Sequence, residues 1–525
     1  MKNKIQLFSF LIISFVYIQA QPTLPRIEEY NGINQLIIKK SPYIMLSGEL
    51  HNSSSSCLEY MQPIWGRLKQ MNLNTIIASV SWELFEPVEG KFDYTLVEGL
   101  IKGARKNNFK LVLIWFATWK NGEGTYVPAW VKKDQVRFPR MQPSPGRSSR
   151  AMSIWGSQVI EADARAYAEL MRYIKKIDAT EQTVLMMQVE NEIGVLGTAR
   201  DMSPLAQQAF AQQVPQELLN SLNQQKDDLT DELRSMMAHI GSRTSGTWLE
   251  MFGYGADEVF MAWHIARCIE TIVQAGKQIY PLPMFVNAWL DPSYSRDISP
   301  NYPSGGPVSK MINVWRAGAP SVDLYAPDIY LDNFKRASGQ YVIAGNPLFI
   351  PETNPDIRSA ANIYYALGQH NAICYAPFAI DGLPESVAKS IGESYGSLAG
   401  FLPFWAKHSG KGKNVGFTYT NAERESLTLG DYRIDVSYSQ KRDTENSIPE
   451  SCGLILQVTP DEFFVTGRNI RVSFSAYSGR SETISIDDGV FVNGVWKPGR
   501  RLNGDEFNIR IGNKPEFRRI ILHKL

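Results

Sequence analysis

The chain has 525 residues, with 54 basic and 53 acidic side chains and a formal net charge of +1. A chain of this length exceeds what one hydrophobic core usually organises, so at least two domains are expected. The near-zero charge gives no electrostatic reason to expect nucleic acid or an anionic membrane surface as a partner, which makes a neutral ligand the better expectation.

The first twenty residues have the layout of a secretory signal peptide. Lys2 and Lys4 precede an apolar stretch over Leu7–Ile18, and the small residue Ala20 follows it. The stretch is too short for a membrane span, and no cysteine near the expected cleavage point offers a lipid attachment site. We therefore expect residues 1–20 to be a signal peptide and the protein to be exported, either periplasmic or secreted.

Eight short apolar segments recur between residues 44 and 378, as is typical of strands buried on both faces of a parallel sheet. They are Ile44–Leu50, Thr75–Ser81, Lys110–Phe116, Thr183–Val189, Pro283–Ala288, Val322–Ile329, Pro347–Ile350 and Ala372–Phe378. Segments of helical period lie between them, for example Leu96–Asn107, Ile160–Ile177 and Glu258–Ile279. This alternation predicts a (β/α)8 TIM barrel over residues 21–405.

Two connections are longer than simple barrel loops. Asn121–Trp155 follows the third strand and is rich in Gly, Pro, Ser and Arg, while Val195–Tyr254 follows the fourth and contains a helix-like piece, Pro204–Gln213. Both are expected to project over the face where the strands end.

From about residue 410 the pattern changes to short alternating segments separated by Asn, Asp and Gly turns. Examples are Ile434–Tyr438, Ile470–Phe474 and Gly489–Val492. We interpret residues 410–525 as a β-sandwich domain.

Cysteines and histidines give no sign of a metal or a disulfide framework. The four cysteines, Cys57, Cys268, Cys374 and Cys452, are widely scattered. The six histidines show no ligand spacing. No metal and no cofactor are therefore expected, and we expect Cys374, inside an apolar run, to be buried.

Two glutamates follow predicted strands. The fourth strand leads into Gln188-Val189-Glu190-Asn191-Glu192-Ile193-Gly194, and Glu352 follows the seventh. Residues at the carboxyl ends of barrel strands face the site of chemistry. Retaining glycoside hydrolysis requires two carboxyl groups about 5 Å apart, one protonated when the glycosidic oxygen leaves and one ionised on the opposite face. The pair therefore predicts a glycosidase.

The string around Glu192 resembles the acid/base motif of family 35 β-galactosidases. Trp82–Asp93 is similar to the motif that follows the second strand in that family. Gly48–His51, on the first predicted strand, also resembles that family. The resemblance covers roughly residues 44–378 and is fairly specific for the wider clan of retaining (β/α)8 glycosidases. It implies that Glu192 is the general acid/base, that Glu352 is the nucleophile and that Asn191 hydrogen-bonds the sugar 2-hydroxyl.

Other candidate substrate-binding residues lie near predicted strand ends. Tyr330 is a candidate donor to Glu352, with packing at the strand end as the alternative. Glu49 either binds sugar hydroxyls or supports the barrel interior. The remaining candidates are Asn287 and two tryptophans expected to stack on sugar faces, Trp119 and Trp289.

The neighbours Asn191 and Glu192 would face opposite ways on a regular strand. Both reach one sugar only if the strand end is bulged or already turning. Glu190 shares its parity with Glu192, so we expect it to point into the barrel lower down as a hydrogen-bonding residue.

One departure bears on the sugar. Family 35 members typically carry Cys-Ala-Glu-Trp after the third strand, where this chain has Trp115–Gly122 and Thr118 replaces the glutamate. We therefore predict a retaining exo-β-galactosidase that acts on polysaccharide-derived oligosaccharides, and leave a β-glucoside, an arabinopyranoside or an internal bond open as substrates. The alternative from another class is an exported glycan-binding barrel without catalysis. The sequence does not indicate an oligomeric state.

Overall fold

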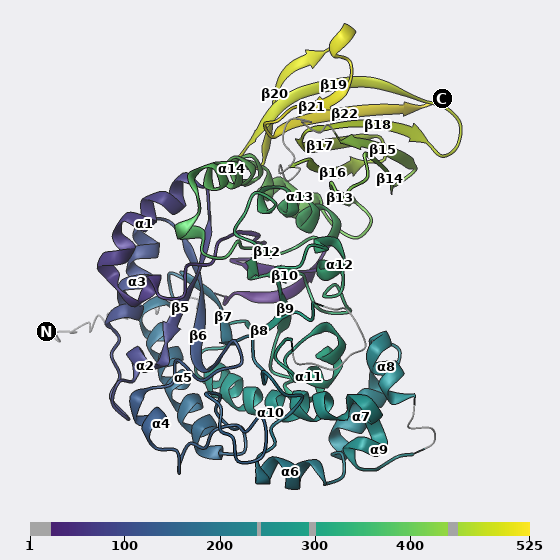
Figure 1. Ribbon diagram of the computed structural model, residues 1–525. Helices are drawn as coiled ribbons and strands as arrows, with labels where there is room; N and C mark the ends of the chain where they lie inside the picture. The colour runs from purple at the N-terminus through teal and green to yellow at the C-terminus, as the bar shows by residue number, and fades with distance from the viewer. Residues whose placement is uncertain (1–22, 239–242, 293–300, 439–449) are drawn as a thin grey trace, which may run out of the picture.

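The computed structural model describes residues 23–238, 243–292, 301–438 and 450–525 (Figure 1). The expected signal peptide, residues 1–20, lies outside the described residues. Within these ranges, no helix has the length and apolarity needed to cross a membrane.

Parallel strands form a barrel at all eight predicted segments, which confirms the fold class. They are β4 (Met45–Leu46), β5 (Thr75–Ser81), β6 (Lys110–Lys120), β7 (Val184–Asn191), β8 (Met284–Trp289), β9 (Leu324–Ile329), β10 (Phe349–Ile350) with β11 (Glu352–Thr353), and β12 (Cys374–Tyr375). The strand orders are β11-β9-β8-β7-β6-β5 and β10-β12-β4.

Two joints close these sheets into one ring. The seventh strand is interrupted at Pro351, so that β10 pairs with β12 on one side and β11 pairs with β9 on the other. At the second joint, Ile77 of β5 donates to the carbonyl of Gly48 and accepts from the backbone N–H of Leu50, both at 3.0 Å. The carboxyl ends of all strands therefore lie on one face.

After each strand the chain forms a helix of the outer layer, which packs outside the ring (Figure 1). In chain order they are α1 (Leu58–Gln70), α3 (Thr95–Lys106), α5 (Ser157–Asp178), α10 (Ala256–Ile279), α11 (Ile312–Gly318), α12 (Phe334–Gly339), α13 (Ser359–His370) and α14 (Glu385–His408). Helix α5 shows the pattern that places them: Val159, Ala166, Leu170 and Ile174 are buried at helical spacing.

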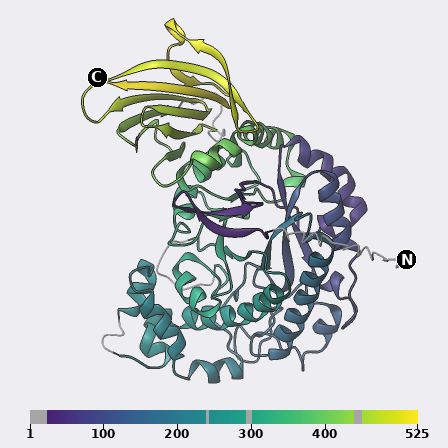
Figure 2. The same cartoon turned by 180° about the vertical axis from the view of Figure 1, so that it is seen from behind.

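A small antiparallel sheet that was not predicted from the sequence precedes the barrel. It consists of β1 (Arg26–Tyr30), β2 (Ile33–Ile38) and β3 (Ser41–Pro42), and it lies across the barrel in Figure 2. Leu36 and Ile38 share a core with interior side chains such as Met45 and Phe285. Cys374 belongs to the same core and is buried as expected.

The two long connections carry extra helices. Helix α4 (Ala129–Lys133) lies in the connection after β6, and α6 (Pro204–Phe210), α7 (Gln216–Gln224), α8 (Asp231–Met237) and α9 (Trp248–Phe252) lie in the connection after β7. A further short helix, α2 (Trp82–Phe85), follows β5. Helix α6 begins at the predicted residue because the Ser203 side chain accepts from the backbone N–H of Ala206 and caps it.

The C-terminal strands form two antiparallel sheets, as the β-sandwich prediction requires. One has the order β13-β16-β17-β22-β19-β20 and the other β14-β15-β18-β21. Their bounds are β13 (Asn414–Thr418), β14 (Arg424–Leu429), β15 (Tyr432–Tyr438), β16 (Cys452–Thr459), β17 (Glu462–Arg468), β18 (Ile470–Ala476), β19 (Ser481–Val492), β20 (Val495–Leu502), β21 (Ile509–Ile511) and β22 (Glu516–Lys524). Side chains of both sheets, such as Val436 and Val465, share one core.

Helices α13 and α14 connect the barrel to the six-stranded sheet. The ring centroid of Phe401 on α14 lies 4.8 Å from that of Phe491 and 5.0 Å from that of Phe517. Arg468 of β17, only 2% exposed, donates to the hydroxyls of Ser390 and Ser394 on α14. Helix α14 thus belongs to the packing of both parts, and it ends at His408, between the predicted barrel and sandwich regions.

The close approach of α13 to the sheet yields a stability prediction. A Cβ atom at Gly368 would lie 2.6 Å from Leu454 Cβ and 2.7 Å from Gly416 Cα, whereas one at Gly66 of α1 would meet nothing within 4 Å. We expect Gly368→Ala to lower the unfolding temperature, because overpacking costs about 1–3 kcal/mol. Gly66→Ala should raise it, because alanine is favoured over glycine in a helix by roughly 0.5–1 kcal/mol.

Thermal unfolding followed by circular dichroism measures both variants. A Gly368→Ala protein that unfolds at or above the temperature of wild type would contradict the tight contact between α13 and the sandwich.

Candidate active site

The end of β7 departs from regular strand geometry, which confirms the condition that the sequence imposes on Asn191 and Glu192. Glu190 and Glu192 have φ angles of 62° and 45°. The register between β6 and β7 jumps from the pair Trp115–Val189 to the pair Lys120–Asn191. Residues 116–119 of β6 therefore stand opposite Glu190 alone, as in a bulge.

Glu190 does not point into the barrel, so the prediction for its direction is wrong. Its two carboxyl oxygens accept from the backbone N–H groups of Thr118, at 3.1 Å, and Trp119, at 2.7 Å. It also hydrogen-bonds Asp163 of α5. The positive φ turns the side chain toward the outer helix, where burial and the charge of Asp163 raise its pKa. Through its two backbone hydrogen bonds, Glu190 thereby stabilises the bulged part of β6.

Three buried carboxyl groups meet at the carboxyl ends of β7, β9 and the seventh strand. One oxygen each of Glu192, Asp328 and Glu352 lies within 4.8 Å of the other two. Glu192 and Asp328 hydrogen-bond each other, which requires a proton between the two carboxyl groups. The Tyr330 hydroxyl donates to Glu352 Oε2 at 2.7 Å. The predicted partner of Glu352 therefore lies in hydrogen-bonding contact with it.

The surroundings of Glu192 favour its protonated form. Burial, followed by the negative charge of Glu352, raises the pKa of Glu192 to about 8, although Lys120 acts in the opposite direction. The pKa of Asp328 is also raised, again by burial first and then by Glu352. At neutral pH this cluster therefore holds protons that exposed carboxyl groups would have lost.

Lys120, the last residue of β6, supplies positive charge to this cluster and was missed in the sequence. Burial lowers its pKa, but the charges of four carboxyl groups raise it by more. Its Nζ lies 2.9 Å from one terminal atom of the Asn191 amide, and the other terminal atom lies 3.2 Å from Glu352 Oε1. With its oxygen toward Lys120 and its nitrogen toward Glu352, the Asn191 amide satisfies both charges.

The two predicted asparagines lie beneath the cluster. Asn287 is fully buried; its Oδ1 accepts from the backbone N–H of Glu192 at 3.0 Å and its Nδ2 donates to Asp328 Oδ2 at 2.7 Å. Asn287 therefore positions the carboxyl groups, and its contact with a sugar stays a prediction. Asn191 is also buried, and its contact with a sugar hydroxyl stays a prediction.

A cavity of about 430 Å³ opens above the cluster. Its lining includes Lys120, Glu192, Trp289, Asp328, Tyr330 and Glu352. Trp289 is 37% exposed and lines the cavity, whereas Trp119 is 1% exposed. The stacking of either ring on a sugar stays a prediction.

Glu49 interacts with the charges of Glu352, Lys120 and Glu192. It is 1% exposed, and neither carboxyl oxygen has a hydrogen-bond partner among the described residues. Burial first and then the charge of Glu352 raise its pKa well above the ordinary range. Its direct contact with sugar hydroxyls stays a prediction.

The oxygens of Glu192, Asp328 and Glu352 form the group of described residues whose spacing could hold a metal ion. The positive charge of Lys120 acts on all three carboxyl groups. The Lys120 ammonium group therefore already supplies positive charge to these carboxyl groups. That the protein needs no metal stays a prediction.

The raised pKa of Glu192 makes the stability depend on pH. Between its ordinary value of 4.5 and about 8, the folded protein holds a proton at Glu192 that the unfolded chain has lost. Stability contributed by this residue therefore falls as the pH rises through that window. Glu192→Gln removes this titration, so its unfolding temperature should rise relative to wild type between about pH 5.5 and pH 8.

Thermal unfolding at the two pH values provides the measurement. The exposed control Glu482→Gln should differ from wild type equally at both. If Glu192→Gln behaves like this control, Glu192 is not held protonated.

Two segments of the chain match known family models. Residues 57–236 match a family 42 glycoside hydrolase model described as β-galactosidase, and residues 391–511 match a domain of unknown function, DUF5597. None of the curated proteins matches the chain.

Several solved structures are similar to this chain. The β-galactosidase from Bacillus circulans sp. alkalophilus has 14% identity and a TM-score of 0.46, over 68% of this chain and 56% of that one. The β-1,4-D-mannanase from Cryptopygus antarcticus has 12% identity and a TM-score of 0.42, over 70% and 94%. The β-amylase catalytic domain from Paenibacillus polymyxa has 13% identity and a TM-score of 0.44, over 66% and 96%. The chain spans 56% of the length of the β-galactosidase.

The family 35 resemblance is not confirmed, because the family 42 model is the one that matches. The matched segment runs from the start of α1 into α8 and contains Lys120 and Glu192. It supports a β-galactosidase-like glycoside hydrolase.

Proposed function

We propose that this protein is a retaining β-glycosidase in which Glu352 is the nucleophile and Glu192 the general acid/base. The pairing of these two residues carries the proposal. Their carboxyl oxygens lie within 4.8 Å of each other, the short separation that is typical of retaining enzymes. They also differ in surroundings, because burial raises the pKa of Glu192 while Glu352 accepts a hydrogen bond from Tyr330.

In the first step, a Glu352 oxygen attacks the anomeric carbon of a β-glycoside. The bond to the glycosidic oxygen breaks, and Glu192 donates its proton to that oxygen, so the leaving group departs as an alcohol. The sugar is then esterified to Glu352 and Glu192 is ionised. Asp328, hydrogen-bonded to Glu192 and to Asn287, positions the acid for this transfer.

In the second step, the ionised Glu192 takes a proton from a water molecule, whose oxygen attacks the anomeric carbon. The ester bond to Glu352 breaks, the sugar leaves with retained configuration, and Glu192 is protonated again. Lys120 and the Tyr330 hydroxyl both act at Glu352, where their positive charge and donor group stabilise the carboxylate that is restored.

For the sugar, we propose a terminal β-galactoside of an oligosaccharide, supported by the family 42 match. A β-glucoside, an arabinopyranoside and an internal bond remain the alternatives. Thr118, which replaces the glutamate of family 35, is buried and donates to Asp163 on the outer helix. Selection of the sugar therefore depends on other residues of the cavity wall. We also propose export, on the N-terminal pattern alone.

A panel of aryl β- and α-glycosides tests the activity. We expect the β-galactoside to release nitrophenol, and Glu352→Gln and Glu192→Gln each to reduce turnover by about 10³-fold or more, because each group makes or breaks a bond in the reaction. Nitrophenol absorbance with purified protein is the measurement.

Azide distinguishes the two roles from a general loss of folding. It should restore turnover only in truncated variants such as Glu352→Gly and Glu192→Ala, which leave room for the anion. Turnover like that of wild type in either Gln variant would reject the assignment.

A second experiment addresses Lys120. Because its charge lowers the pKa of Glu192, Lys120→Met should move the alkaline limb of the kcat/KM profile, expected near pH 8, to higher pH. The rate should also fall by roughly 10²-fold, the usual effect of losing one electrostatic group. Lys110→Met, the same change at the other end of β6, serves as the control and should leave the limb in place. An unmoved limb in Lys120→Met would show that Lys120 does not act on the acid.

A further inference from the structure

A second cavity, the serine pocket, lies beside the candidate active site at the end of β5. It has a volume of about 180 Å³ and is lined by the loop after β4, by α2 and α3, and by Tyr126. Its size is close to the roughly 150 Å³ of a cavity that holds benzene, so it has room for one six-membered ring.

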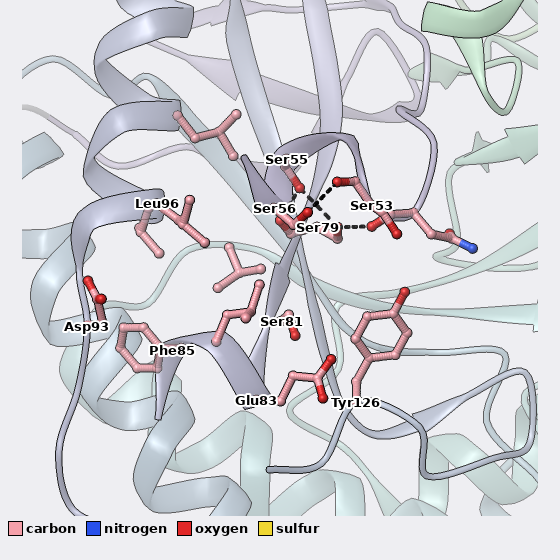
Figure 3. Close-up of a pocket in the computed structure, with 15 residues that line it drawn as sticks. Ser53, Ser55, Ser56, Ser79, Ser81, Glu83, Phe85, Asp93, Leu96 and Tyr126 are labelled. Carbon is pink, nitrogen blue, oxygen red and sulfur yellow. Dashed lines mark hydrogen bonds between the residues drawn. The ribbon is translucent and has the colours of Figure 1, made fainter. Parts of the chain in front are cut away.

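The two sides of the serine pocket differ in polarity (Figure 3). Phe85 and Leu96 lie on one side, with Asp93 next to Phe85. Leu100 also lines the pocket. Ser81, Glu83 and Tyr126 lie on the other. A pyranose ring has the matching character, because its C–H groups form an apolar face and its hydroxyls a polar edge.

Most serines of the pocket already bond to the backbone. Ser55 Oγ donates to the carbonyl of Ser79 at 2.7 Å, and Ser79 Oγ donates to the carbonyl of Asn52 at 2.9 Å. Two buried oxygens are different: Ser81 Oγ and Asn52 Oδ1 have no hydrogen-bond partner among the described residues. Buried polar atoms are normally paired, so these two oxygens lack the partner that such atoms usually have.

Glu83 adds a charged acceptor at the polar side. The Nζ of Lys132 on α4 lies 2.9 Å from Glu83 Oε2. This ion pair orients the Glu83 carboxylate at the pocket. Carboxylates accept hydroxyl hydrogens strongly. The pocket therefore combines fixed acceptors with an apolar wall, as carbohydrate recognition requires.

The serine pocket and the active-site cavity are neighbours. Asn52 lines both. Tyr126 lies between their charges: burial first raises its pKa, Lys120 of the active site lowers it and Glu83 of the pocket raises it. The two cavities therefore adjoin at Asn52.

We propose that the serine pocket is a second sugar subsite, which binds one pyranose unit of an oligosaccharide whose neighbouring unit lies at Glu192 and Glu352. This inference rests on the proposed glycosidase function. It makes the enzyme selective for chains over simple aryl glycosides, because binding energy at the pocket is available only to a substrate that reaches it.

Ser81→Val tests this subsite. Ser81 has extended backbone and makes no side-chain cap bond to α2, so valine fits the backbone while filling the pocket and removing the unpaired oxygen. We expect the ratio of kcat/KM for β-1,4-galactotriose over that for an aryl β-galactoside to fall about tenfold, equivalent to roughly 1.4 kcal/mol of lost binding. Glu83→Gln should lower the same ratio. Ser475→Val, on an exposed strand of the sandwich, is the matched control and should not change it.

Calorimetry separates this inference from the proposed function. In Glu352→Gln protein, galactotriose should bind about tenfold more weakly when Ser81→Val is added, whether or not wild type is active. If wild type hydrolyses no glycoside but this affinity still falls, the glycosidase proposal fails and the pocket remains a sugar site. An unchanged ratio together with an unchanged affinity would overturn the subsite.

Discussion

The burial of four carboxyl groups around one ammonium group is the constraint on which the candidate site depends. Glu49, Glu192, Asp328 and Glu352 all act on Lys120, and their ionised forms cannot all persist so close together without water. Protons and hydrogen bonds must therefore compensate for the missing solvent. The two carboxyl groups therefore differ in their surroundings. Glu192 keeps its proton, whereas Glu352 is surrounded by the Tyr330 hydroxyl, the Lys120 ammonium group and the Asn191 amide.

Lys120 reaches this cluster only because β6 and β7 are irregular at their ends. Asp163 of α5 accepts from the indole N–H of Trp115 at 2.7 Å and hydrogen-bonds Glu190, which in turn accepts from two backbone N–H groups of β6. A second buried carboxyl pair outside the barrel thus shapes the end of β6, which carries the lysine inside it. Strain at the positive φ of Glu190 and Glu192 is the local cost of that arrangement.

The sandwich lies on the side of α13 and α14, away from the long connections after β6 and β7 (Figures 1 and 2). Its six-stranded sheet packs on both helices through aromatic rings and through Arg468. The DUF5597 match begins inside α14, which fits a helix that belongs to the packing of both parts. The barrel and the sandwich are therefore expected to influence each other's stability.

Local patterns in the sequence determined the eight strands, their helices, the sandwich and the two glutamates at strand ends, because burial on both faces and helical period are properties of neighbouring residues. Tertiary structure alone decided the roles of Lys120, Asp163 and Asp328. The sequence did contain two signals, a charged residue among the apolar positions of α5 (Asp163) and another within β9 (Asp328). Neither signal indicates which residue the charge contacts. Glu190 was misplaced because a positive φ and a bulge overrode strand parity, and those arise from hydrogen bonds between segments far apart in the chain.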